Sequence, residues 1–219
     1  VDSVESAADL ETLVAKTDVL ILSLFDDAAV TEILDSLLQL DLTGKLIIET
    51  STISPAVLKD RIDEITTRGA TAVDAPISGG PELVLAGSCG VFIGGDDAAA
   101  ARAQGNLVTI SNRIAHVGPL GTGLVMKVIN NGMIQTYFAG LSELMPLARR
   151  AGLPLETALR ILCAGPAGMP LISNRIDKIT GKDDSIGFAI NAAFKDNAVC
   201  KQVLDSFGLD APILDRFEA

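Results

Sequence analysis

The first third of the chain alternates short, uninterrupted apolar runs with longer segments in which apolar residues recur at helical spacing. The runs are bounded by polar residues, which indicates strands covered on both faces, as in a parallel sheet. The expected strands are residues 18–25, 45–50 and 70–74, and the expected helices are residues 4–16, 28–40 and 55–68. Strands and helices at this spacing predict βαβ units, and therefore a parallel sheet with right-handed crossovers.

The pattern changes after residue 74. We expect a loop at 75–81, a helical turn at 82–85, a strand at 89–94, a helix at 96–105 and short edge strands at 107–110 and 113–117. Beyond Leu124 only helices are expected, at 123–151, 154–163, 169–179 and 194–206. The predicted fold class is α/β. A partial Rossmann-type parallel-sheet domain at 1–118 precedes an all-α domain at 119–219, and a long interdomain helix joins the two.

The composition then excludes several classes of function. The 219 residues carry a net charge of −11 with a pI near 4.4, so the basic surface that nucleic acids require is absent, as is a basic face for anionic lipid. No apolar run approaches the roughly 18–20 residues that span a bilayer. Three cysteines at unrelated spacings favour reduced thiols in an intracellular protein, and we favour the cytoplasm over the mitochondrion. With one histidine and no Cys/His cluster, no metal site is expected.

A glycine-rich turn at residues 118–123 runs directly into the long apolar helix, and two polar residues follow on that helix. Lys127 and Asn131 lie four residues apart, so they share one helix face, with Cβ atoms roughly 5–6 Å apart. A buried ammonium loses hydration, which lowers its pKa toward the range of proton exchange near neutral pH. One interpretation is a proton-transfer lysine beside an amide that orients substrate. The other is a lysine whose ammonium reaches solvent near a helix start.

Two further clusters have the chemistry to bind ligands. Ser78, Gly79 and Gly80 follow a predicted strand, and successive backbone N–H groups there can form a concave nest for a carboxylate. The alternative is an ordinary turn. At residues 194–197, Lys195 follows an aromatic residue at the start of a helix, and on its own this pattern is typical of a solvated helix terminus.

Together these clusters resemble the β-hydroxyacid dehydrogenase family, typified by 3-hydroxyisobutyrate dehydrogenase and related to 6-phosphogluconate dehydrogenase. The motifs that carry the resemblance extend over nearly the whole chain, at residues 74–80, 87, 94–95, 116–118, 121–123, 127–131 and 194–196. The resemblance implies an N-terminal nicotinamide-binding domain and an α-helical C-terminal domain that usually dimerises. It also implies reversible oxidation of a small β-hydroxy acid, with NAD or NADP as the hydride acceptor.

The resemblance further implies roles for individual residues. The family's catalytic lysine falls on Lys127, the general base in oxidation and the general acid in reduction, and its substrate-orienting amide falls on Asn131. Its loop for the substrate carboxylate falls on Ser78, Gly79 and Gly80. The implied cofactor contacts are Leu24, Phe25, Thr52 and Lys195. The expected partners are a small hydroxy-acid substrate and further copies of the chain, as a homodimer or homotetramer.

The sequence departs from the family pattern in several places. The family begins with a Gly-x-Gly-x-x-Gly turn, whose following helix N-terminus holds the pyrophosphate, and no such turn precedes the first predicted strand. We therefore expect this chain to lack the first βαβ unit of about 30 residues, together with the residue that selects NAD or NADP. Phe25 replaces a proline, Asn197 replaces a leucine, and the chain ends soon after Phe217.

Three functions are compatible with these observations. The prediction is an NAD(P)-dependent dehydrogenase of a small β-hydroxy acid, given as a truncated chain. The alternative is a shortened homologue that serves as a small-acid-binding or dimerisation module without hydride transfer. An imine reductase of the same architecture is disfavoured, because those relatives replace the lysine that stands here at Lys127.

Overall fold

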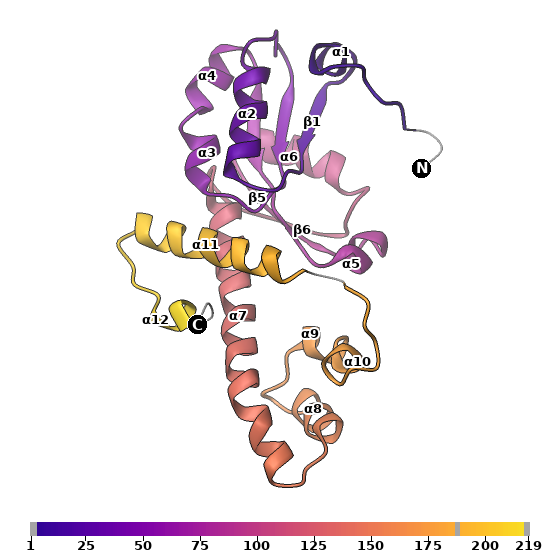
Figure 1. The fold of residues 1–219 in the computed structure, drawn as a ribbon. Coiled ribbons are helices and arrows are strands. Elements are labelled where there is room, and N and C mark those ends of the chain that lie inside the picture. Colours follow the sequence, from indigo (N-terminus) through magenta and orange to yellow (C-terminus); the bar gives the residue numbers. More distant parts are fainter. Residues whose placement is uncertain (1–3, 187–188, 217–219) are drawn as a thin grey trace.

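The computed structural model describes residues 4–186 and 189–216 (Figure 1). The strands are β1 (Val19–Leu22), β2 (Leu46–Glu49), β3 (Thr71–Asp74), β4 (Ile77–Ser78), β5 (Gly90–Gly94) and β6 (Arg113–Gly118). The helices of the α/β part are α1 (Leu10–Lys16), α2 (Asp27–Leu37), α3 (Pro55–Lys59), α4 (Ile62–Thr67), α5 (Pro81–Leu85) and α6 (Asp97–Leu107). The helices that follow are α7 (Thr122–Arg150), α8 (Leu155–Ala164), α9 (Pro170–Ser173), α10 (Ile176–Ile179), α11 (Ile190–Ser206) and α12 (Pro212–Asp215).

The six strands form one sheet in which β1, β2 and β3 are parallel neighbours. Next to β3 lies β5, which runs antiparallel to β3 and β4 and parallel to β6. The prediction of an α/β fold with a parallel-dominated sheet and a helical C-terminal part is confirmed (Figure 1). The sheet becomes mixed after residue 74, where the sequence pattern also changes. Among the strands that the structure describes, β1 pairs with β2 alone, and Ile21 in its centre is 46% exposed.

Helices cover both faces of β2, which explains its uninterrupted apolar sequence. Ile47 packs on one face against residues of α2, α3 and α4. Leu46 and Ile48 point to the other face and pack against the alanine-rich side of α6. All three side chains are fully buried. A strand buried on both faces has no position left for a solvent-exposed polar residue, so the usual apolar/polar alternation is lost.

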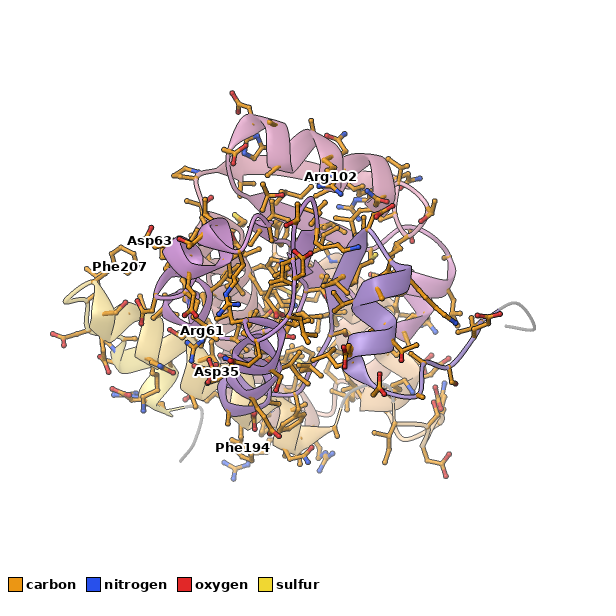
Figure 2. The ribbon with its side chains drawn as sticks, turned by 90° about the horizontal axis from the view of Figure 1, so that it is seen from above. Asp35, Arg61, Asp63, Arg102, Phe194 and Phe207 are labelled. Carbon is orange, nitrogen blue, oxygen red and sulfur yellow. The ribbon has the colours of Figure 1, made fainter. Side chains whose placement is uncertain are left out.

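Hydrogen bonds from two arginine side chains connect the covering helices to one another and to the sheet (Figure 2). Arg61, between α3 and α4, donates from Nε to Asp35 Oδ1 of α2 at 2.8 Å. On α6, Arg102 donates to the backbone carbonyls of Asp18 and Gly44 at 3.1 and 3.0 Å. These two residues precede β1 and β2, so one guanidinium ties a helix to the start of two strands.

The prediction is wrong for part of one helix and for one whole strand, and packing explains both differences. Only the second part of the predicted helix 4–16 forms, as α1, where Asp9 caps the helix and Val14 is buried. In the first part of the predicted helix Val4 is 74% exposed, so this part has no core to pack against. Residues 107–110 are not a strand. Leu107 ends α6, and its carbonyl accepts the N–H of Ile110 in a turn.

Two predicted helices are each divided in the structure. The segment 55–68 forms α3 and α4, because the N–H of Arg61 bonds to the carbonyl of Leu58, three residues earlier. Likewise the segment 169–179 forms α9 and α10, and the N–H of Arg175 bonds to the carbonyl of Ile172. Such tightened turns interrupt the α-helical ladder. The hydrophobic spacing alone does not reveal them.

The C-terminal helices pack along α7, which descends from the α/β part in Figure 1. α11 crosses α7 and forms a small core with it that includes Val128, Cys200 and Val203. Further along α7, Leu141 packs with α8, α9 and α10 through residues such as Leu159 and Ile172. The short helix α12, which the sequence pattern did not predict, covers the first of these cores. Within the described ranges, no helix is both long and apolar enough to cross a membrane.

Glu49 at the end of β2 is a buried acid in this sheet. Its side chain is fully buried opposite Asp74, its register partner in β3. Oε1 accepts the N–H of Ser51 at 2.5 Å, whereas Oε2 has no hydrogen-bond partner in the part of the chain that the structure describes. Burial, together with the neighbouring Asp74 carboxylate, raises the pKa of Glu49 to about 7, although the bonds from Ser51 lower it. The carboxyl is therefore protonated in mildly acidic solution.

This raised pKa predicts a pH-dependent stability that glutamine removes. Between pH 4.5 and about 7 the folded state keeps a proton that the unfolded chain has released, so the free energy of unfolding falls as pH rises. We expect the wild type to lose about 3 kcal/mol across this range relative to Glu49→Gln. Urea unfolding of both proteins at several pH values measures the difference. Parallel pH profiles for the two proteins would contradict the prediction.

Candidate active site

The N-terminal end of α7 is bound to the sheet through Asp74, the last residue of β3. Its Oδ1 accepts the N–H of Gly121 at 2.6 Å, and its Oδ2 accepts that of Leu124 at 2.7 Å. Burial raises the pKa of this carboxyl despite these backbone donors. Gly121 has φ of 92°, and a Cβ on Gly123 would overlap a backbone carbonyl of β5. The glycine-rich turn thus allows α7 to approach the sheet closely, which fixes the place of Lys127.

Lys127 lies about one turn along α7 with its amine inside the protein. The residue is only 8% exposed, and Nζ donates to the carbonyl of Ile77 at 2.7 Å. Burial is the main cause that lowers the pKa of Lys127, and the charge of Lys195 lowers it further, whereas Asp196 opposes both. The side chain does not extend into solvent. Its geometry and lowered pKa suit a group that exchanges a proton.

Asn131 lies on the same face of α7 and is held by neighbours on two elements. Its Nδ2 donates to Asp196 Oδ2 of α11 at 2.9 Å. Its Oδ1 accepts from Asn130 Nδ2 at 3.1 Å, and the same Nδ2 lies 3.0 Å from Ser78 Oγ. The amide of Asn131 is therefore fixed in orientation between the Ser78 loop and α11.

The Ser78 loop and α7 border a cavity of about 430 Å³. Ser78 ends β4, Gly79 has φ of 139°, and Gly80 precedes the first residue of α5. These three residues line the cavity together with Lys127 and Asn131, as the sequence predicted they would share a site. The remaining lining, from α7, α9 and α11, is mainly apolar and includes Ile134, Phe138 and Leu171.

The four residues predicted to contact a cofactor also lie together, at the carboxyl ends of β1 and β2. Lys195 Nζ donates to the carbonyl of Thr52 at 2.9 Å and lies 5.8 Å from the centroid of the Phe25 ring. The N–H of Leu24 donates to Ser51 Oγ at 2.8 Å. Phe25 is 58% exposed. This edge is where open α/β sheets bind ligands.

Sequence reasoning missed three residues of the site. Asp196 belongs to the motif at residues 194–196, but the sequence predicted no role for it. In the structure it accepts a hydrogen bond from Asn131 and forms an ion pair with Lys195 at 2.7 Å. Asn130 stood beside Asn131 and bonds to the Ser78 loop. Arg175 lines the cavity from the turn between α9 and α10, and no sequence pattern marked it. In residues 4–186 and 189–216, no three His, Cys, Asp or Glu side chains gather to hold a metal ion.

Comparison with known proteins gives consistent matches along the chain. The family model for the NAD binding domain of 6-phosphogluconate dehydrogenase matches residues 2–118. The model for the NAD-binding part of NADP-dependent 3-hydroxyisobutyrate dehydrogenase matches residues 121–219. Both models describe binding of a nicotinamide dinucleotide, which confirms the prediction of NAD or NADP as cofactor.

Individual proteins show the same relationship. Mitochondrial 3-hydroxyisobutyrate dehydrogenase of Homo sapiens is 32% identical over 148 residues, which cover 68% of this chain and 44% of that protein. 2-(Hydroxymethyl)glutarate dehydrogenase of Eubacterium barkeri is 30% identical over 154 residues, 70% of this chain and 51% of that protein. The matched segment thus spans about half the length of these curated relatives.

A solved structure of Mycobacterium tuberculosis 3-hydroxyisobutyrate dehydrogenase with L-serine shares the fold. It superposes with a TM-score of 0.86 at 23% sequence identity, over 96% of this chain and 75% of that one. The family resemblance predicted from the motifs is confirmed by the two family models. This chain therefore belongs to the 3-hydroxyisobutyrate dehydrogenase-like family, within the 6-phosphogluconate dehydrogenase superfamily.

Proposed function

We propose that this chain interconverts a small β-hydroxy acid and its aldehyde or keto acid, with NAD or NADP as cofactor. The observation that carries the proposal is the burial of the Lys127 amine, with a lowered pKa, in the cavity lined by Ser78, Gly79, Gly80 and Asn131. A proton-transfer group, an orienting amide and a loop rich in backbone donors are what oxidation of a hydroxy acid requires of a protein.

The names of the relatives support this substrate class. 3-Hydroxyisobutyrate and 2-(hydroxymethyl)glutarate both carry a hydroxymethyl group on the carbon next to a carboxylate. We infer that the present chain acts on the same unit. The carboxylate would lie against the Ser78 loop, where backbone N–H groups and a hydroxyl donate hydrogen bonds. The hydroxyl would lie between Lys127 and Asn131.

The proposed mechanism assigns one task to each side chain. In oxidation the neutral amine of Lys127 takes the proton of the substrate hydroxyl, and in reduction the ammonium returns it. Asn131, fixed by Asn130 and Asp196, orients the hydroxyl toward Lys127. Burial of Lys127 keeps its amine from bulk water, which strengthens its polar interactions with the substrate.

The cofactor region has features that fit a nicotinamide dinucleotide. An exposed aromatic ring at Phe25, backbone groups at Leu24 and Thr52, and the cation of Lys195 meet at the carboxyl ends of β1 and β2. We infer that these residues hold the nicotinamide end, because aromatic rings and backbone donors suit its ring and amide. When bound, NAD or NADP supplies the acceptor for the hydride.

Cofactor titration and turnover together test this function. The purified chain is titrated with NADH and with NADPH by nicotinamide fluorescence, and is then assayed with 3-hydroxyisobutyrate and 2-(hydroxymethyl)glutarate. We expect saturable binding of at least one cofactor and oxidation of at least one acid. Acid binding without any cofactor binding would favour the alternative, a shortened homologue that serves as an acid-binding or dimerisation module.

We also infer that the chain forms a homodimer or homotetramer within the cell. Several large apolar side chains of α7 and α8 are more than half exposed, among them Met133, Leu144, Leu147 and Ile161. Apolar surface of this kind commonly marks an interface. A monomer in sedimentation experiments at micromolar concentration would contradict the inference.

The free thiols of Cys89, Cys163 and Cys200 support an intracellular location, which imaging of the tagged full-length protein checks.

A further inference from the structure

We propose that the substrate carries a second carboxylate, which binds the guanidinium of Arg175 on the α9–α10 side of the cavity. This inference rests on the proposed function, since it assigns the substituent of the same hydroxy acid. Arg175 and the Ser78 loop line one cavity although they come from different parts of the fold. In Figure 1, α5, which follows that loop, and α9–α10 lie above and below the start of α11, on the same side of α7.

The guanidinium of Arg175 is the charged group of this cavity that remains unengaged. Lys127 donates to a backbone carbonyl, and Asp196 is bound by Lys195 and Asn131. Arg175 is half-buried, and its side chain makes no hydrogen bond or ion pair with residues 4–186 or 189–216. An unpaired guanidinium presents a planar set of donors that matches a carboxylate through two parallel hydrogen bonds.

The shape of the cavity leaves room for a substituent that reaches Arg175. Its volume of about 430 Å³ lies within the usual range of small-molecule sites. None of the four proposed cofactor residues lines it, so this space lies on the substrate side of Lys127. Phe138 and Leu171 provide apolar walls beside Arg175. A short methylene chain between two carboxylates would pack on such walls while its ends meet polar groups.

The charges of the cavity also favour a doubly negative ligand. The protein as a whole has a net charge of −11, yet Arg175 places a cation in a cavity whose acidic residue is Asp196, and Lys127 adds a second cation whenever it is protonated. Asp196 is already neutralised by Lys195. A local excess of positive charge in an acidic protein raises the concentration of anions at the site. The substrate class is therefore a β-hydroxy dicarboxylic acid rather than a monocarboxylic one.

Calorimetric titration with butyrate and glutarate isolates the contribution of the second carboxylate. Glutarate is butyrate with one added carboxylate, and neither acid requires a cofactor or turns over. We expect the full chain to bind glutarate at least tenfold more tightly than butyrate. In Arg175→Met the affinity for glutarate should fall to that for butyrate, while butyrate binding stays within twofold. Arg175→Lys should keep part of the preference, because it retains the charge and loses the paired geometry.

Arg150→Met is the matched control, since it removes the same charge from the exposed end of α7, outside the cavity. It should leave both affinities unchanged. Unaltered butyrate binding in Arg175→Met also shows that this variant is folded. Equal binding of the two acids by the wild type, no binding of either, or a preference that survives in Arg175→Met would each overturn the inference.

The outcomes also separate this inference from the proposed function. A preference for glutarate that depends on Arg175, without NAD(P)-dependent oxidation of any hydroxy acid, would support the second carboxylate site and contradict the dehydrogenase activity. Oxidation of hydroxy acids without a preference for dicarboxylates would support the activity and overturn the role of Arg175.

Discussion

Replacement of Lys127 by alanine should lower kcat/KM for hydroxy-acid oxidation by a factor of about 10²–10⁴, the usual contribution of a general base. The amine of Lys127 is buried in the substrate cavity, and the carboxylate that also lines this cavity, Asp196, is already bound by Lys195 and Asn131. The assay follows the absorbance of the reduced nicotinamide with saturating cofactor. Substrate affinity, measured separately, should change less than kcat.

Two variants separate proton transfer from charge. Lys127→Arg keeps a cation in the cavity but cannot give up its proton, so it should be as inactive as Lys127→Ala. Lys16→Ala removes an amine from the exposed end of α1 and should leave the rate unchanged. Activity of Lys127→Arg close to that of the wild type would show that Lys127 binds substrate by its charge alone.

The pH dependence follows from the same lowered pKa. Oxidation requires the neutral amine, so kcat/KM for oxidation should rise with pH and level off above the pKa of Lys127. Reduction requires the ammonium and should fall over the same range. Because burial lowers this pKa, the midpoint should lie below that of an ordinary lysine. A midpoint in the ordinary lysine range would contradict the assignment of this pH dependence to the buried amine of Lys127.

Replacement of Asp74 by alanine should lower the free energy of unfolding by about 2–4 kcal/mol, as expected when buried backbone donors lose a charged acceptor. Its carboxylate accepts from Gly121 and Leu124 and so joins β3 to the first turn of α7. The raised pKa of Asp74 moderates the loss, because removal of a buried charge relieves part of its desolvation. Urea unfolding followed by circular dichroism gives the value.

Asp97→Ala provides the comparison for Asp74→Ala. Asp97 begins α6 with a fully exposed side chain, so its loss should change the free energy of unfolding by less than about 0.5 kcal/mol. Because Asp74 fixes the start of α7, Asp74→Ala should also lower kcat through displacement of Lys127. Equal stability of the two variants would show that the first turn of α7 is held by other contacts.

Much of the α/β part was predictable, because a strand buried on both faces has an uninterrupted apolar run in the sequence. β1, β2 and β3 each lie within a predicted apolar run, and α2 begins directly after Asp26, whose carboxylate caps it. The family motifs were readable for a similar reason. Glycines such as Gly123 are required wherever a backbone approaches another closely, whatever lies further away. The expected pairing of Lys127 and Asn131 needed only the helical repeat.

Element ends and breaks were less predictable, because they depend on what covers each segment. Residues 107–110 have a strand-like composition, but Leu107 is drawn into the core as the last residue of α6. The break at Arg175 between α9 and α10 leaves no mark in the apolar spacing. That break also determines the position of Arg175 in the lining of the cavity.

The sequence by itself determined the family and most of the order of elements, and it pointed to the residues of the proposed site, because these follow from local periodicity and from motifs that each need only a few neighbours. Only the tertiary structure decided the environment of the reacting groups. Lys127 meets Ile77 across 50 residues, and Asn131 meets Asp196 across 65. Burial and electrostatic interaction depend on such distant neighbours, so the lowered pKa of Lys127 and the unpaired state of Arg175 arise only when α7, α9–α10 and α11 pack together.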